Sequence, residues 1–187
     1  MPYYGKDGKW VPCTPQYGKD GEWLQMGASS RITHPTVAMS ANESGGYLAT
    51  ASTTYSTKYE PWRAFDKSLS GNAWISAKDD ANAWIWLKLP RPITVTKISI
   101  ANRIRTDGLV NGVIDARIDA SNDKTTWSEI GMITGRDGTA SGLVTEHSIP
   151  RSAVPYQYIR IKPLSWQNMD NTESYVSIAE IEITGVE

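Results

Sequence analysis

The feature that most constrains the fold is an alternation of apolar and polar residues with a period of two. It is clearest over residues 93–100 and returns at residues 113–120, 127–133, 156–162 and 175–183. A period of two is typical of strands, in which successive side chains point to opposite faces of a sheet. Turn signals at residues 106–108, 121–123 and 136–138 separate these segments, and no segment has the pattern of an amphipathic helix. The sequence therefore predicts an all-β chain folded as an antiparallel β-sandwich.

The first 27 residues are organised differently because they contain a short internal repeat. Tyr-Gly-Lys-Asp-Gly-Lys-Trp-Val at residues 4–11 returns as Tyr-Gly-Lys-Asp-Gly-Glu-Trp-Leu at residues 17–24. Asp-Gly is a tight-turn signal, so each copy predicts a small hairpin or hook. We expect residues 1–27 to form an N-terminal arm for attachment or oligomerisation, residues 28–35 to be a linker and residues 36–187 to be the main domain. A flexible terminal arm is the alternative.

Charge, hydropathy and cysteine content exclude several classes of protein. The net charge of -1 argues against a general binder of nucleic acid. The chain lacks an apolar run of about 18 residues and begins without a secretory signal, so we expect no membrane insertion. Cys13 is the only cysteine, which rules out an internal disulfide and a cysteine-based zinc cluster.

Four separated segments together resemble one known family. Ala-Phe-Asp at residues 64–66 closes on Trp74, and the apolar strand Trp-Ile-Trp-Leu-Lys-Leu follows at residues 84–89. A strand end, polar turn and new strand occupy residues 120–127, and Ile-Ala-Glu-Ile-Glu-Ile-Thr-Gly ends the pattern at residues 178–185. This succession resembles the discoidin or coagulation factor 5/8 type C family of galactose-binding-like domains, which includes carbohydrate-binding modules. The resemblance covers residues 36–187 and implies a discoidin-like jelly roll.

The resemblance also implies a structural calcium ion. In the family, the loop that begins at the position of Asp66 and the start of the last strand commonly hold calcium through carboxylates and backbone carbonyls. The matching positions here are Asp66, Asn72 and Glu180, and oxygen ligands suit this hard cation. Two departures are Lys67, where the family usually has glycine, and Asn72, where it usually has threonine. Alternatively, Asp66 caps its turn and Glu180 accepts a hydrogen bond from a loop amide.

Ligand-binding residues of the family lie on loops at one end of the sandwich, which correspond here to residues 51–61, 102–111 and 165–174. Sugar recognition needs a flat aromatic face and planar polar groups that reach neighbouring hydroxyls. The predicted ligand-binding residues are Trp166, Asn168, Arg103, Tyr59 and Trp62. The alternative is that Arg103 pairs with Asp107 or Asp115 and that Trp166 packs under its own loop.

The other tryptophans have different expected roles. Trp74, Trp84 and Trp127 match family positions that are packed, which implies that they hold the sandwich together. Trp86 lies out of step with the apolar residues of its strand, so the pleat predicts that it faces away from the core.

The chain carries no recognisable catalytic motif. Its carboxylate pairs are adjacent or on one strand, whereas a glycosidase needs two carboxylates across a cleft, and we expect no enzyme activity. The predicted function is non-catalytic carbohydrate binding. The N-terminal repeat resembles short repeats of bacteriophage tail and virion proteins, which implies a tail or virion-surface component that attaches to host-surface glycans.

The predicted location is therefore the virion, or otherwise the extracellular space. The expected partners are a cell-surface glycan, other virion or tail proteins through the arm, and further copies of the chain in a homo-oligomer. The alternative function is a structural decoration or assembly protein of a virion whose sandwich contacts other proteins and binds no sugar.

Overall fold

The computed structural model describes residues 3–6, 9–12, 16–19, 22–25, 30–70, 73–105, 107–140, 142–150, 154–168 and 174–187. The chain divides into two compact units, Met1–Ser30 and Arg31–Glu187. Within the described ranges, no helix is both long enough and apolar enough to cross a membrane.

The first unit contains two hairpins of the same construction. β1 (Tyr3–Lys6) pairs antiparallel with β2 (Lys9–Pro12), and β3 (Gln16–Lys19) pairs in the same way with β4 (Glu22–Gln25). Each hairpin contains one copy of the repeat at equivalent positions, which confirms the predicted pair of small hairpins. The Asp-Gly pairs that predicted the turns lie outside the described residues.

The second unit consists of strands and two short 3-10 helices. The strands are β5 (Arg31–His34), β6 (Glu43–Ser44), β7 (Tyr47–Ala51), β8 (Trp74–Ile75), β9 (Ile85–Ala101), β10 (Arg103–Ile104), β11 (Val110–Ser121), β12 (Ser128–Ile133), β13 (Val144–Ser148), β14 (Tyr156–Asn168), β15 (Ser177–Ile178) and β16 (Glu180–Val186). The helices are η1 (Thr57–Tyr59) and η2 (Pro61–Phe65).

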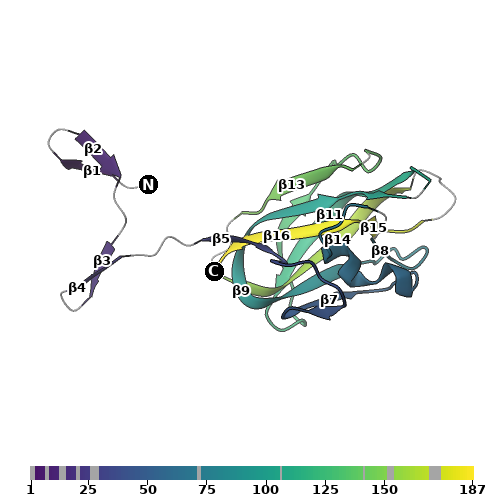
Figure 1. Cartoon of the computed structure of the whole chain (residues 1–187), viewed down its shortest axis with the longest axis horizontal. Coiled ribbons are helices and arrows are strands. Elements are labelled where there is room, and N and C mark those ends of the chain that lie inside the picture. Colours follow the sequence, from purple (N-terminus) through teal and green to yellow (C-terminus); the bar gives the residue numbers. More distant parts are fainter. Residues whose placement is uncertain are drawn as a thin grey trace. The chain divides into compact units, whose positions relative to one another are not determined.

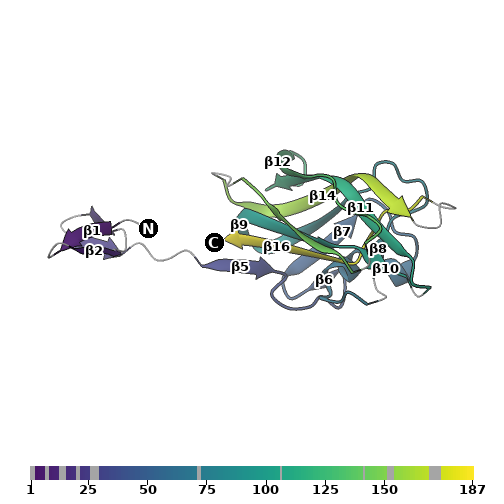
Figure 2. The same ribbon diagram turned by 90° about the horizontal axis from the view of Figure 1, so that it is seen from above.

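The long strand β9 belongs to both layers of the sandwich. Its first part, up to Ile93, pairs with β7 on one side and β14 on the other. Its last part, from Thr94, pairs with β13 and β16. Pro90 and Pro92 lie exposed between the two parts, where a residue without an amide donor is tolerated. One layer therefore contains β7, β9, β14, β11 and β12, and the other contains β13, β9, β16 and β5 (Figures 1 and 2).

The core lies between these two layers and follows the strand alternation. Ile85, Leu87 and Leu89 of β9 are fully buried, as are Phe65 and Trp74 at the two ends of the segment that links η2 to β8. Burial of each such side chain contributes about 1.5–3 kcal/mol relative to its exposure. The structure confirms the predicted antiparallel β-sandwich.

One expected boundary is wrong. β5 lies within the predicted linker at residues 28–35, yet its four residues pair antiparallel with β16 from His34↔Ile183 to Arg31↔Val186. The four residues of β5 are too few to be recognised as a strand from their alternation. Their partner strand, β16, lies at the other end of the chain and gives no local signal.

The outer face of the first layer carries Trp86. This side chain lies opposite Arg160 of β14 and outside the core cluster, which confirms that it points away from the core. It is nevertheless only 9% exposed, since it packs edge-to-face against Tyr158 with ring centroids 5.6 Å apart.

Arg160 connects this face to a buried carboxylate. Its Nη2 atom donates to Asp119 Oδ2 at 2.6 Å, and Arg117 Nε lies 2.8 Å from Asp119 Oδ1. The Arg160 guanidinium also stacks at 4.0 Å on the ring of Trp127. Trp127 is half-buried and lies outside the core cluster, so its packing is against Arg160 on the outer face.

Candidate functional site

The ends of β10, β11 and β14 bring two of the predicted ligand-binding residues into one row. Arg103 lies opposite Asn111, and Asn111 lies opposite Asn168. The backbones of Arg103 and Asn168 therefore lie in one row, two strands apart. The side chain of Asn168 lies outside the described part of the chain.

Arg103 contacts a third predicted residue, Tyr59. Its guanidinium carbon lies 5.3 Å from the centroid of the Tyr59 ring, within the range of a cation-π interaction. Burial lowers the pKa of Arg103, and Tyr59 partly opposes that effect. Arg103 Nε is buried and has no hydrogen-bond partner among the described residues. No described protein group therefore accepts a hydrogen bond from this N–H.

The carboxylates proposed as alternative partners of Arg103 bind other groups. Asp107 forms an ion pair with Arg105 at 2.9 Å. Asp115 accepts hydrogen bonds from the Gly135 amide at 2.9 Å and from the Ser165 hydroxyl. These bonds lower the pKa of Asp115, with the Ser165 contribution the larger.

Two further tyrosines form a cluster with Tyr59, in which Tyr55 lies beside Tyr59 and Tyr175 lies beside Tyr55. The ring of Tyr55 is 6.0 Å from that of Tyr59 and 5.1 Å from that of Tyr175. Tyr55 belongs to a loop that the sequence analysis considered, but it was not among the predicted ligand-binding residues, and Tyr175 was missed entirely. Tyr175 directly follows the predicted loop at residues 165–174, which is the only sequence signal that could have found it.

Backbone hydrogen bonds to β8 and to Ser76, the residue after it, fix the segments that carry Tyr55 and Tyr175. The amide of Tyr55 donates to the Ile75 carbonyl at 2.9 Å. The Ser76 amide donates to the Val176 carbonyl at 2.9 Å, and the Val176 amide donates to Ser76 Oγ at 3.0 Å. The backbones of Tyr55 and of Tyr175, the neighbour of Val176, are thereby tied to the same short strand segment.

Trp62 lies on η2, where its polar and apolar surfaces are already in contact with other groups. Its Nε1 donates to Glu60 at 3.0 Å, its amide donates to Asn42 Oδ1 at 3.2 Å, and the Arg63 guanidinium covers its ring at 3.9 Å. Beside it runs an open groove of about 530 Å³ along β7. Polar residues of the groove include Asn42, Thr50, Thr54, Ser56, Thr57 and Glu60. No contact between Trp62 and Arg103 is present in the described part of the structure.

Trp166 occupies a less accessible position than a stacking platform requires. It lies opposite Val113 on β11 and packs against the core cluster, so it is partly buried. This packing agrees with the alternative that the sequence left open. The structure therefore brings Arg103 and Tyr59 together and leaves Trp62 and Trp166 in separate environments.

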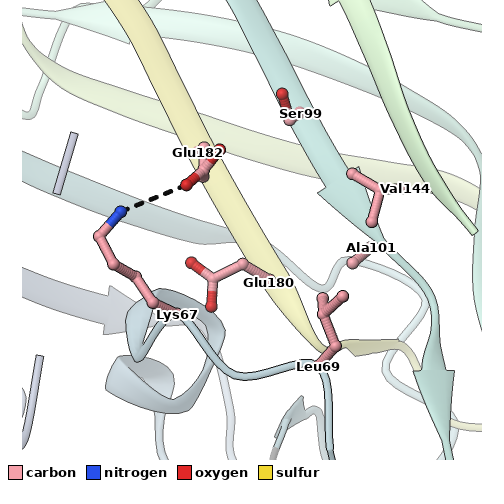
Figure 3. Close-up of a pocket in the computed structure, with 7 residues that line it drawn as sticks. All are labelled: Lys67, Leu69, Ser99, Ala101, Val144, Glu180 and Glu182. Atoms are coloured by element: carbon pink, nitrogen blue, oxygen red, sulfur yellow. Dashed lines mark hydrogen bonds and ion pairs between the residues drawn. The ribbon is translucent and has the colours of Figure 1, made fainter. Parts of the chain in front are cut away.

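A second candidate site surrounds Glu180 at the start of β16 (Figure 3). A cavity of about 250 Å³ is lined by Lys67, Leu69, Ser99, Ala101, Val144, Glu180 and Glu182. Glu180 is 7% exposed, and neither carboxylate oxygen has a hydrogen-bond partner among the described residues. Burial, and secondarily the charge of Asp66, raise the pKa of Glu180 to about 9.

The two carboxylates at this site fit a hard cation. Asp66 and Glu180 are near enough to repel each other, and Glu180 presents two unsatisfied oxygens. Asp66 Oδ1 accepts the Ser68 amide at 2.9 Å, so Asp66 does cap its turn. The Lys67 amide lowers the pKa of Glu180, although its position does not have the geometry of a hydrogen bond.

Other features of this site are less typical of calcium binding. Lys67 has a left-handed φ of 59°, and its ammonium lies 3.2 Å from Glu182 Oε1. The described part of the chain contains no group of three or more His, Cys, Asp or Glu side chains placed to hold a metal. Asn72 lies outside the described residues.

Comparison with known proteins identifies the family. The profile of the F5/8 type C domain matches residues 48–181, and the chain belongs to this family. No curated protein sequence is similar enough to count as a relative.

Several solved structures share the fold. A CBM32 module of CpGH89 from Clostridium perfringens, in complex with GalNAc-β-1,3-galactose, is 17% identical with a TM-score of 0.60, covering 74% of this chain and 95% of its own. Chitosan-binding module 1 of a chitosanase/glucanase from Paenibacillus sp. IK-5 is 25% identical with a TM-score of 0.57, covering 74% and 94%. Chitosan-binding module 2 of the same enzyme, in complex with chitotriose, is 18% identical with a TM-score of 0.58, covering 74% and 95%. The second unit therefore has the fold of a carbohydrate-binding module.

Proposed function

We propose that this protein is a non-catalytic glycan-binding protein whose site lies at the loop end of the sandwich. The observation that carries the proposal is the contact between Arg103 and Tyr59, in which the Arg103 Nε–H has no acceptor among the described residues. A guanidinium offers several donors in a plane, and a tyrosine ring offers a face for the C-H surface of a sugar. The sugar complexes of structurally similar modules support the same class of ligand.

A glycan array with the full-length protein displayed multivalently tests the proposal, because multivalency makes weak single sites measurable. We expect defined glycan hits that Arg103→Met removes. The matched control is Arg91→Met, since Arg91 is exposed and pairs only loosely with Glu187 at 3.7 Å. A folded parent protein that binds no glycan contradicts the proposal, as does binding that survives Arg103→Met.

We propose in addition that Asp66 and Glu180 help to hold a calcium ion, with Asn72 as a third ligand. Two unsatisfied oxygens on a buried carboxylate support this assignment. The ion would supply a positive charge that fixes the Asp66 turn against the start of β16. The role is structural, since the ligands lie on different segments from Arg103 and Tyr59.

Thermal unfolding with calcium and with a chelator tests the ion. We expect calcium to raise the melting temperature of the parent and of Glu146→Gln, but not of Glu180→Gln. Glu146 is the control because it is an exposed glutamate paired with Lys97 at 2.6 Å. An equal response of all three proteins contradicts the assignment.

For the arm, we propose attachment or oligomerisation in a virion tail or surface. Two hairpins of one design in a single small unit favour a repeated contact with other chains. In this role the arm binds tail proteins or further copies of this chain, and the sandwich binds the host glycan. The alternative is an assembly protein whose sandwich contacts only other proteins.

Removal of residues 1–27 tests the arm. We expect the molecular mass in solution, measured by light scattering, to fall to that of a single chain, while the circular dichroism of the sandwich is retained. An unchanged mass, with unchanged incorporation into particles, is the result that contradicts the proposal.

A further inference from the structure

We propose that Tyr55 is the central contact of a tyrosine cradle, formed by Tyr55, Tyr59 and Tyr175, that binds two neighbouring sugar units of one free glycan chain. The proposal rests on glycan binding at the loop end and adds a preference: an oligosaccharide is bound more tightly than its single sugar. It also adds Tyr55 and Tyr175 to the residues that determine specificity.

The tilt of the three rings carries this proposal. The ring of Tyr55 is inclined by 47° to that of Tyr59 and by 75° to that of Tyr175. The ring faces therefore point in different directions and cannot form one flat platform. Sugars contact aromatic faces through their C-H surfaces, so each sugar unit needs its own ring face. Tilted faces suit successive units of a bent chain better than the flat surface of a crystalline polysaccharide.

Accessibility identifies Tyr55 as the central contact. Tyr55 is 54% exposed, whereas Tyr59 and Tyr175 are half-buried. Tyr55 also lies between the other two rings, at 6.0 and 5.1 Å. Both neighbouring rings are in direct contact with Tyr55, so a sugar unit stacked on the exposed part of Tyr55 places the next unit within reach of a second ring.

The cations beside Tyr59 add a polar end to the cradle. Lys58 Nζ lies 5.5 Å and the Arg103 guanidinium 5.3 Å from the centroid of that ring. Both are donors without acceptor capacity, which suits sugar hydroxyl oxygens. A glycan lying along the rings from Tyr175 to Tyr59 therefore ends at hydrogen-bond donors.

The cradle is held in place before any ligand binds. Thr53 Oγ1 donates to Asp80 at 2.6 Å, and Trp74 Nε1 donates to the Thr53 carbonyl at 3.0 Å, two residues before Tyr55. The amide of Tyr55 is itself bound to the carbonyl of Ile75. Preorganised contacts lose less conformational entropy on binding, so exposed tyrosines on this fixed backbone make an effective recognition surface.

Isothermal titration of the full-length protein provides the test, with GalNAc-β-1,3-galactose against galactose and chitotriose against glucosamine as probes. We expect one of the oligosaccharides to bind more tightly than its single sugar. Tyr55→Ala should weaken that oligosaccharide about fivefold, as loss of one aromatic contact predicts, and should weaken it more than the single sugar, so that the preference is lost. Tyr55→Phe should retain the preference, because the ring face and not the hydroxyl makes the contact.

The control for a truncated exposed side chain is Leu164→Ala on β14, since Leu164 is 50% exposed. It should leave all four affinities unchanged, and thermal unfolding checks that each variant is folded. Equal affinity for oligosaccharide and single sugar in the parent overturns the cradle alone, as does a preference that survives Tyr55→Ala. A parent that binds neither these probes nor any glycan of the array overturns the proposed function and the cradle together.

Discussion

Three described arginines, Arg63, Arg103 and Arg160, lie over aromatic rings, and the surroundings of Arg103 and Arg160 differ. On the outer face of the first layer, Arg160 lies 4.0 Å from Trp127, and its Nε and Nη2 both donate to Asp119 at 3.1 and 2.6 Å. At the loop end, Arg103 lies 5.3 Å from Tyr59, and its Nε has no acceptor in the described part of the structure.

The difference separates a stabilising contact from one that is available to a ligand. A buried donor without a partner lowers stability by about 1–3 kcal/mol relative to a satisfied one. A ligand that accepts a hydrogen bond from the donor would remove this cost. The aromatic contact alone does not distinguish the two sites, because both arginines have one. The missing acceptor separates Arg103 from Arg160, but Arg63 Nε on η2 also lacks one, so the candidate site at the loop end rests on the combination of Arg103 with the neighbouring tyrosines.

The largest expected effect comes from removing Asp119, the carboxylate that pairs with both Arg117 and Arg160. Asp119→Ala leaves Arg117 and Arg160 without the carboxylate whose side chain is only 2% exposed. We expect the free energy of unfolding, measured with urea, to fall by about 3 kcal/mol. Glu129→Ala is the control, because Glu129 lies opposite Asp119 on β12 and is exposed. Equal losses in the two variants would show that the network has no special role.

Removal of each arginine in turn tests the comparison directly. Arg160→Met should lower stability by roughly 2 kcal/mol and leave glycan binding intact, since a buried Asp119 loses one of its two partners. Arg103→Met should change stability by less than about 1 kcal/mol while it removes binding, because no described acceptor of its Nε is lost. Urea unfolding and the glycan array measure the two properties; a stability loss in Arg103→Met as large as in Arg160→Met contradicts the distinction.

Glu180 extends the comparison to a buried carboxyl group without a described hydrogen-bond partner, and we expect its effect to appear as a dependence of stability on pH. Its pKa is raised from the ordinary 4.5 to about 9, so between these values the folded state binds more protons than the unfolded state. Stability in the presence of a chelator should then decrease as the pH rises from about 5 to 9. The decrease should be smaller in Glu180→Gln, and melting temperatures across this range measure both slopes. If the stability of the parent protein changes with pH as little as that of the variant, the raised pKa is contradicted.

The smallest expected effect is at Lys67. Its φ of 59° favours glycine, because a residue with a Cβ is strained in the left-handed region by about 1–2 kcal/mol. Lys67→Gly also loses the partly exposed ion pair with Glu182, which contributes at most about 1 kcal/mol. The net change in the free energy of unfolding should be a gain of no more than about 1 kcal/mol. Lys97→Gly, which loses the comparable pair with Glu146 from within β9, should instead be destabilised.

Much of the fold could be predicted from the sequence, because alternation determines which side chains of a strand share a face. It placed Ile85, Leu87 and Leu89 in the core and Trp86 on the other side. Alternation does not say which strands become neighbours, since pairing is decided by packing across the whole chain. For this reason β5 was taken for a linker.

The candidate site was predicted less completely than the fold. Arg103 and Tyr59 were chosen one by one for their chemistry, and the structure shows that they touch. Tyr175 could not be chosen in that way, because its place beside Tyr55 results from pairing of β15 with β8. The roles of Trp166 and Trp62 were also undetermined, since the same indole can stack on a ligand or pack under a loop.

The passage of β9 through both layers has a consequence for cooperativity. Because the seventeen residues of Ile85–Ala101 are hydrogen-bonded first to one sheet and then to the other, neither layer can separate without disturbing the strand they share. The second unit should therefore unfold in a single transition. Amide hydrogens in the middle of each half of β9 should exchange with solvent at similar, very low rates, because both require global opening of the domain.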